Sequence, residues 1–83
     1  MTSILAVDDS ASMRQMVSFT LKGAGFDVRE ATDGVEALEI AKTESFDLVL
    51  TDVNMPNMNG IDLLKNIKGN NKLYHIPVIM LSS

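Results

Sequence analysis

The sequence of 83 residues contains no cysteine and no tryptophan, and it has two prolines and one histidine. Without cysteine the chain forms no disulfide and offers no thiolate to a metal ion. The single histidine, His75, has no second histidine or cysteine near it, which argues against a transition-metal centre. A chain without cysteine fits a reducing compartment, and we expect a cytoplasmic protein.

Positive charge is also scarce, with seven Lys and Arg residues against eleven Asp and Glu residues and a net charge of −4. A nucleic-acid-binding surface needs a basic face, so this balance argues against direct binding of nucleic acid. No apolar stretch approaches the ~20 residues that span a bilayer. The N-terminus lacks the basic opening and the long apolar segment of a signal peptide. We therefore expect neither a membrane nor a nucleic acid as a partner.

Short apolar runs alternate with helical patterns along the chain, whose length suits one small domain. Residues 4–7, 48–51 and 78–82 are typical of buried parallel strands. Residues 26–31 alternate between apolar and polar, which favours a more exposed edge strand. A strand and a helix repeated three times, followed by a strand, predict an α/β fold with a parallel sheet and helices on both faces.

Helical spacing also predicts which side chains of the three helices face inward. In the first helix, which Ser10 can cap, Met13 and Met16 are expected in the core. In the second, Asp33 followed by Glu36 predicts a variant of the capping box. In the third, the spacing predicts one apolar face made of Ile61, Leu64 and Ile67.

Three aspartates stand at the ends of two of the apolar runs. Asp8 and Asp9 follow residues 4–7, and Asp52 follows residues 48–51. Taken singly, each could be a strand-end or helix-capping residue without chemistry. In an open α/β sheet, however, ligands bind at the carboxyl ends of the strands, so neighbouring strands would bring the three carboxylates together. Such a group needs a divalent cation with oxygen ligands, and we predict Mg²⁺.

Four segments resemble the receiver domain of bacterial two-component response regulators, most closely the stand-alone chemotaxis type (CheY-like). The matching segments are ILAVDDSASMRQMV, ATDGVEAL, DLVLTDVNMPNMNGIDLL and IPVIMLSS. Together they span nearly all of the chain, and their order makes the combination specific. The resemblance implies a flavodoxin-like, three-layer fold, here with a sheet of four parallel strands in the order 2-1-3-4 and three helices.

The resemblance also implies a role for each site residue. Asp52 would be the phosphoacceptor and would take a phosphoryl group from a histidine kinase. Asp9 and Asp52 would bind Mg²⁺ through their carboxylates, the backbone carbonyl of Asn54 would be another ligand, and Asp8 would act through water. The Ser82 hydroxyl would contact the phosphoryl group. The family catalyses only its own phosphorylation and dephosphorylation, so we do not expect an enzyme; the intact family member would bind the flagellar motor switch.

The family pattern continues beyond this sequence into a fourth helix, a fifth strand and a fifth helix. Residues 1–83 are therefore expected to form a single, incomplete receiver domain. The lysine that the family carries at the end of the fifth strand has no counterpart among the lysines of this chain, so phosphoryl chemistry is expected to be impaired. The metal ligands all lie within the chain.

An open fourth strand and a first helix without its usual neighbour would leave apolar surface uncovered, including Phe19. We therefore expect a homodimer or a higher oligomer. One alternative hypothesis is a structural fragment that associates with itself and does not signal. Another is a phosphatase of the haloacid dehalogenase type, but that class needs a second acid two residues after its nucleophile, and Asn54 stands there.

Overall fold

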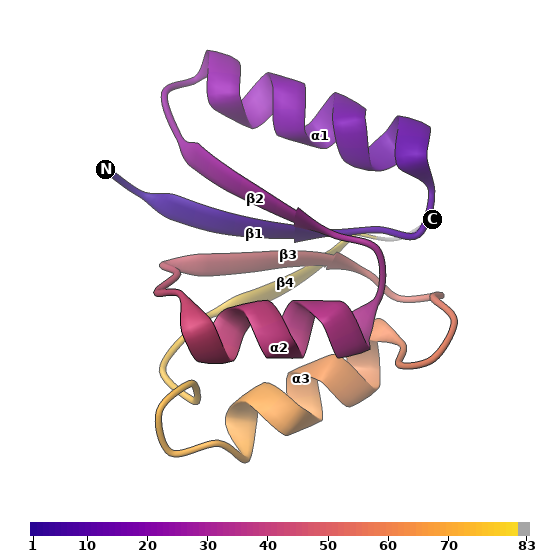
Figure 1. Ribbon diagram of the computed structural model, residues 1–83, viewed down its shortest axis with the longest axis vertical. Coiled ribbons are helices and arrows are strands. Elements are labelled where there is room, and N and C mark those ends of the chain that lie inside the picture. Colours follow the sequence, from indigo (N-terminus) through magenta and orange to yellow (C-terminus); the bar gives the residue numbers. More distant parts are fainter. Residues whose placement is uncertain (82–83) are drawn as a thin grey trace.

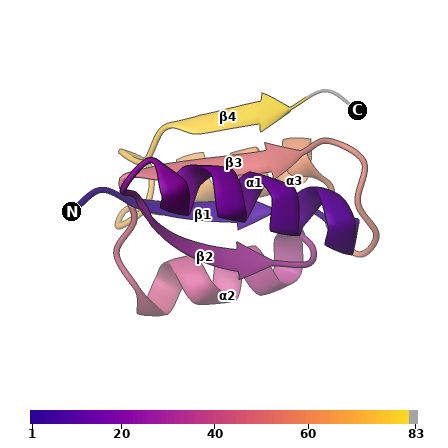
Figure 2. The same cartoon turned by 90° about the horizontal axis from the view of Figure 1, so that it is seen from above.

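The structure is a computed structural model that describes residues 1–81, arranged in three layers (Figure 1). Four parallel strands form one sheet in the order β2-β1-β3-β4. Helix α1 covers one face, and α2 and α3 cover the other (Figures 1 and 2). The elements are β1 (Ser3–Val7), α1 (Ala11–Gly23), β2 (Asp27–Ala31), α2 (Gly34–Thr43), β3 (Leu48–Asp52), α3 (Gly60–Lys68) and β4 (Val78–Leu81). The predicted fold class, strand order and helices are confirmed.

The register of the sheet brings the carboxyl ends of the strands to one edge. Val7 at the end of β1 lies opposite Ala31 of β2 and Thr51 of β3. Among residues 1–81, strand β2 pairs only with β1, as its alternating pattern predicted for an edge strand. Asp8 and Asp52 therefore leave neighbouring strands at nearly the same height. Within residues 1–81, no helix is long and apolar enough to cross a membrane.

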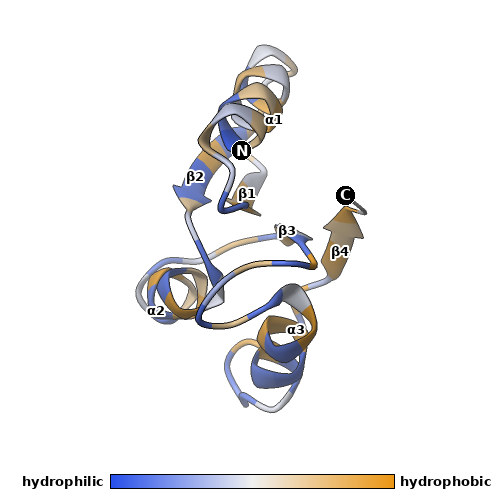
Figure 3. Cartoon of the chain, turned by 90° about the vertical axis from the view of Figure 1, so that its right-hand side faces the viewer, coloured by the Kyte–Doolittle hydropathy of each residue, from blue (hydrophilic) through white to orange (hydrophobic). Residues whose placement is uncertain are grey.

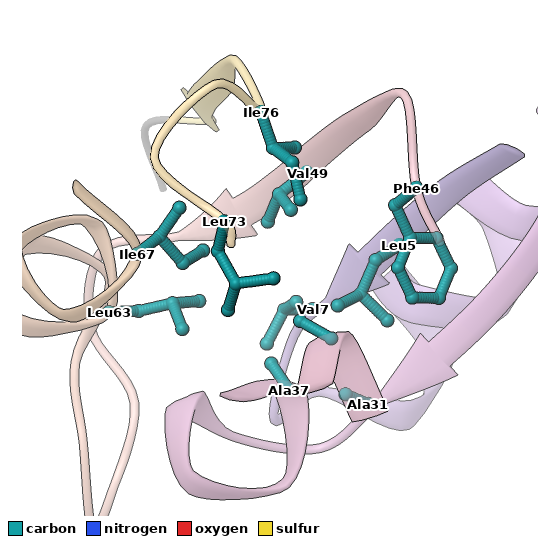
Figure 4. Close-up of a cluster of buried hydrophobic side chains, with 11 residues drawn as sticks. Leu5, Val7, Ala31, Ala37, Phe46, Val49, Leu63, Ile67, Leu73 and Ile76 are labelled. Atoms are coloured by element: carbon teal, nitrogen blue, oxygen red, sulfur yellow. The ribbon is translucent and has the colours of Figure 1, made fainter. Parts of the chain in front are cut away.

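The main core lies between the sheet and the pair α2 and α3 (Figure 4). Leu5 and Val49 from the two central strands are fully buried there, and so are Leu63 and Ile67 of α3. Burying a side chain of this size contributes roughly 1.5–3 kcal/mol of hydrophobic stabilisation. The core thus holds β1 and β3 side by side. This pairing brings together the aspartates at the ends of the two strands.

The predicted apolar face of α3 is wrong in part. Ile67 is buried as expected, but Ile61 is 46% exposed and Leu64 is half-buried, while Leu63 is fully buried. The buried face therefore consists of Gly60, Leu63 and Ile67. The cause is the tight start of the helix: Gly60 packs directly against the backbone of β3, and this contact sets the rotation of the whole helix.

The prediction that Met13 and Met16 lie in the core is also wrong. They are 46% and 56% exposed, and Phe19 is 81% exposed. Helix α1 contacts β1 and β2, and no other described helix lies on its face of the sheet, so one flank of α1 stays uncovered (Figure 2). The companion expectation, that this helix would carry uncovered apolar surface, is confirmed.

Side chains cap the helices as the sequence indicated. The Ser10 hydroxyl caps α1, and Asp33 caps α2 by accepting the Glu36 N–H at 2.9 Å. The Glu36 carboxylate reaches back to accept the N–H of Thr32 at 2.8 Å, one residue before the capping aspartate. The Glu36 N–H, and then the Asn57 side-chain amide, stabilise the ionised carboxylate of Asp33 and lower its pKa below the usual value. Helix α2 therefore begins at an ionised N-cap residue, Asp33, whose carboxylate accepts two hydrogen bonds.

Candidate functional site

Three carboxylates converge at the edge of the sheet where β1 and β3 end. One oxygen from each of Asp8, Asp9 and Asp52 lies within 4.8 Å of the other two. Asp52 is only 7% exposed, Asp8 is half-buried and Asp9 is exposed. Figure 3 looks onto this edge, where the hydrophilic ends of β1 and β3 contrast with the hydrophobic β4. The predicted convergence of the three aspartates is therefore observed.

The carboxylate of Asp52 is oriented by its own neighbours on the chain. The N–H of Val53 donates to Oδ1 of Asp52 at 2.8 Å, and the Thr51 hydroxyl donates to the Asp52 carbonyl at 2.9 Å. The N–H of Gly60 donates to the Val53 carbonyl at 2.9 Å, so the start of α3 closes over the end of β3. The other carboxylate oxygen, Oδ2, accepts no hydrogen bond from residues 1–81 and is free for a ligand.

The segment that follows β3 is held by the start of α2. The Asn57 side-chain amide donates to Oδ2 of Asp33 at 2.7 Å, and the N–H of Gly34 donates to the Met58 carbonyl at 3.1 Å. Asn57 has a φ of 67°, a left-handed conformation that asparagine tolerates better than most residues. Together these bonds fix residues 53–59 to a second helix.

Asp8 is fixed mainly through its backbone. Its N–H donates to the Ala31 carbonyl at 3.1 Å, its Oδ1 accepts the N–H of Ser10 at 2.9 Å, and its carbonyl accepts from Arg14 at 2.9 Å. Sequence reasoning missed Arg14, because no local pattern signals a contact between a helical arginine and the end of the preceding strand. The carboxylate of Asp9 has no hydrogen-bond partner in the described part of the chain.

The geometry suits a small divalent cation. Mg²⁺ binds oxygens at about 2.1 Å, so two ligand oxygens on opposite sides of one ion lie about 4.2 Å apart. The three aspartate oxygens span at most 4.8 Å, which fits a site in which one carboxylate binds through water. Because Asp8 and Asp52 each give one oxygen to a backbone N–H, each keeps the other for the ion. Without a cation, three like charges repel one another there.

The roles of two further site residues, Asn54 and Ser82, stay predictions. Asn54 is exposed and lies two residues beyond Asp52, in the loop between β3 and α3. Its carbonyl therefore belongs to a loop that begins at the candidate site. Ser82, the expected phosphoryl contact, lies outside the described residues. Leu81, the last residue of β4, lies opposite Asp52 in the register.

Comparison with known proteins identifies a family. Residues 4–83 match the model of the response regulator receiver domain. The chemotaxis protein CheY-3 of Vibrio cholerae serotype O1 is 49% identical over 81 residues, which cover 96% of this chain and 62% of that protein. The chain therefore spans less than two thirds of the length of this relative.

Solved structures give the same result. The structure of the chemotaxis response regulator CheY4 of Vibrio cholerae has a TM-score of 0.92 and 46% identity, over 96% of this chain and 67% of that one. The response regulator protein TrrA of Thermotoga maritima, solved in complex with Mg²⁺-BeF, has a TM-score of 0.89 and 30% identity, over 99% of this chain and 70% of that one.

Proposed function

Because the chain belongs to the response regulator receiver domain family of two-component signalling, we propose that it is a phosphoacceptor module of the chemotaxis type. Asp52 is the residue that accepts the phosphoryl group. The observation that carries this proposal is the convergence of Asp8, Asp9 and Asp52 within 4.8 Å at the end of two central strands. Receiver domains are signalling domains and not classical enzymes, so the modification itself is the output.

The chemistry assigned to Asp52 is a transfer between two covalent partners. A carboxylate oxygen attacks the phosphorus of a phosphohistidine, the P–N bond breaks, and the histidine nitrogen leaves with the electron pair and takes up a proton. The Val53 N–H donates to Oδ1 and so holds the carboxylate in a fixed orientation for this attack. Positioning and charge neutralisation supply most of the catalysis in such transfers.

The proposed cofactor is Mg²⁺, which when bound neutralises charge on the carboxylates and on the phosphoryl oxygens. Asp9 and Asp52 would hold it directly, Asp8 through water and Asn54 through its carbonyl, and Ser82 would donate its hydroxyl to the phosphoryl group. The span of the three carboxylates and the Mg²⁺-BeF complex of TrrA support this assignment. Kinship with CheY proteins supports a histidine kinase and the flagellar motor switch as partners, and a cytoplasmic location.

Phosphorylation is tested by intact mass after incubation with Mg²⁺ and a small donor such as phosphoramidate. We expect one added phosphoryl group on the wild type and none on Asp52→Asn, because the amide is not a nucleophile toward phosphorus. Asp62→Asn is the matched control, since Asp62 is an exposed carboxylate on α3, and it should keep the adduct. An adduct that survives in Asp52→Asn, or no adduct on folded wild type, would contradict the proposal.

We also infer that the 83-residue chain by itself associates with a second copy through β4. The described part of the chain pairs one edge of β4 with β3 and leaves the other edge open. Ile79 and Leu81 of this strand are 49% and 39% exposed, and no lysine or proline interrupts it. An open apolar edge is a template for pairing, and antiparallel contact with an identical strand is self-complementary.

Light scattering after size exclusion at micromolar concentrations tests this association. We expect a dimer or larger species that shifts toward monomer in Ile79→Lys, because a charge would be buried at the paired edge. Val35→Lys changes a residue of similar exposure, 45%, on the other side of the molecule and should leave the size unchanged. A monodisperse wild-type monomer would rule the association out.

A further inference from the structure

A half-buried ion pair lies directly behind the acidic site. Arg14 of α1 is 15% exposed and Glu30 of β2 is 33% exposed, and Nε of the arginine donates to Oε1 of the glutamate at 3.1 Å. The same guanidinium donates through Nη1 to the carbonyl of Asp8 at 2.9 Å. One side chain therefore ties the first helix and an edge strand to the segment that carries two of the three site aspartates.

The hydrogen bond from Nη1 of Arg14 is important because its acceptor is the Asp8 carbonyl. The Asp8 carbonyl belongs to the peptide group that joins Asp8 to Asp9, so a bond to it fixes the plane of that peptide. The Asp8 N–H and carboxylate are already held by Ala31 and Ser10, whereas the Asp9 carboxylate has no hydrogen-bond partner among the described residues. The direction of the Asp9 side chain thus depends on the peptide that Arg14 holds.

The charge of Arg14 makes its pairing important. A guanidinium bonded to the Asp8 carbonyl could turn toward the site carboxylates and form ion pairs of its own, since arginine matches carboxylates in two-bond geometry. Such a rearrangement would compete with a metal ion for the same oxygens. Glu30 of β2 gives the guanidinium another ion-pair partner, since its Oε1 lies 3.1 Å from Nε of Arg14. This contact holds the guanidinium toward β2. Nη1 donates to the site segment at the Asp8 carbonyl, which is not a carboxylate.

We propose that Arg14 and Glu30 form a positioning pair that orients the Asp8–Asp9 peptide and keeps the guanidinium from occupying the acidic site, so that a divalent cation binds there. This inference rests on the proposed magnesium site and adds two residues behind its ligands. Partners of this kind typically change metal affinity by about 10–100-fold when they are removed.

The test is Mg²⁺ affinity, measured by calorimetry, in a double-mutant cycle. Glu30→Gln should weaken binding about tenfold, because it releases Arg14 toward the carboxylates. In an Arg14→Met background, where no guanidinium can compete, the same Glu30→Gln change should alter the affinity less than about twofold. Arg14→Lys should keep the carbonyl bond in part and bind Mg²⁺ better than Arg14→Met.

The second ion pair of the chain is the matched control. Arg29 and Glu44 lie 3.0 Å apart, but they are 53% and 41% exposed and lie on elements that do not carry the aspartates. Glu44→Gln changes the net charge as much as Glu30→Gln does, so it reports the long-range effect of charge alone. Equal losses of Mg²⁺ affinity in Glu30→Gln and Glu44→Gln would overturn the proposal.

Amide hydrogen exchange without metal gives an independent readout. The Asp9 N–H belongs to the peptide group whose carbonyl Arg14 holds, so Arg14→Met should speed exchange at this amide while Arg29→Met leaves it unchanged. Wild-type protein that binds Mg²⁺ with no change in any Arg14 or Glu30 variant would overturn this inference alone. Folded wild-type protein that binds no Mg²⁺ would overturn both the inference and the proposed site.

Discussion

Replacing Gly60 with alanine should destabilise the fold severely, with a loss of about 3 kcal/mol or more in the free energy of unfolding. A Cβ at this position would collide with the backbone carbonyl oxygen of Asp52, and it would also come within 3.2 Å of the Cα of Val53. Neither atom belongs to a flexible side chain, so α3 would have to move away from β3. A chain of this size has a total stability of only about 4–12 kcal/mol, so the loss is a large fraction of it.

Urea unfolding followed by circular dichroism measures this loss. Gly23→Ala is the matched control: Gly23 closes α1, its added Cβ would meet nothing within 4 Å, and alanine there should stabilise by about 0.4–1 kcal/mol. Opposite signs for the two substitutions are expected. A Gly60→Ala variant as stable as wild type would show that the start of α3 does not lie against the backbone of β3.

Asp52→Asn should stabilise the metal-free protein by about 1–3 kcal/mol and remove its response to Mg²⁺. Asp52 is 7% exposed and its carboxylate lies within 4.8 Å of two others, so without a cation it adds repulsion where solvent screens little. Asparagine keeps an oxygen for the Val53 N–H, so the substitution removes the charge and preserves the hydrogen bond.

Urea unfolding in EDTA and in Mg²⁺ separates these two effects. The wild type should gain about 2.7 kcal/mol when free Mg²⁺ is 100 times its dissociation constant, because the ion binds only the folded chain. The variant should gain far less, whereas Asp62→Asn should respond as the wild type does. If the variant were less stable than the wild type in EDTA, the Asp52 carboxylate would stabilise the metal-free fold. Repulsion among the three carboxylates would then not be the dominant effect.

The strands and the acidic site follow from the sequence for different reasons. The runs at residues 4–7 and 48–51 are apolar because β1 is buried on both faces, while β3 is buried on one face and half-buried on the other. Continuous apolar runs of this kind indicate the inner strands of a parallel sheet. The strand order does not follow from such runs, which say nothing about neighbours, and here it came from the family resemblance. Once β1 and β3 are adjacent, parallel direction alone brings Asp8 and Asp52 together.

The features that sequence reasoning missed depend on contacts between distant segments. Arg14 meets Glu30 across sixteen residues, from a helix to a strand, and no spacing rule connects the two positions. The rotation of α3 was ambiguous because Ile61, Leu63, Leu64 and Ile67 offer two overlapping apolar faces. The fit of Gly60 against the backbone of β3 decides between them, and this contact depends on how two distant segments fold together.

The central place of β1 has a consequence for the order in which the chain is made. Ser3–Val7 leaves the ribosome before β2, β3 and β4, yet it lies between β2 and β3, so both of its edges wait for later residues. Its pairing with β2 can form once residue 31 has emerged, but its second edge stays open until residues 48–52 follow. The growing chain thus passes through a stage with one unsatisfied central strand, and synthesis of β3 ends it.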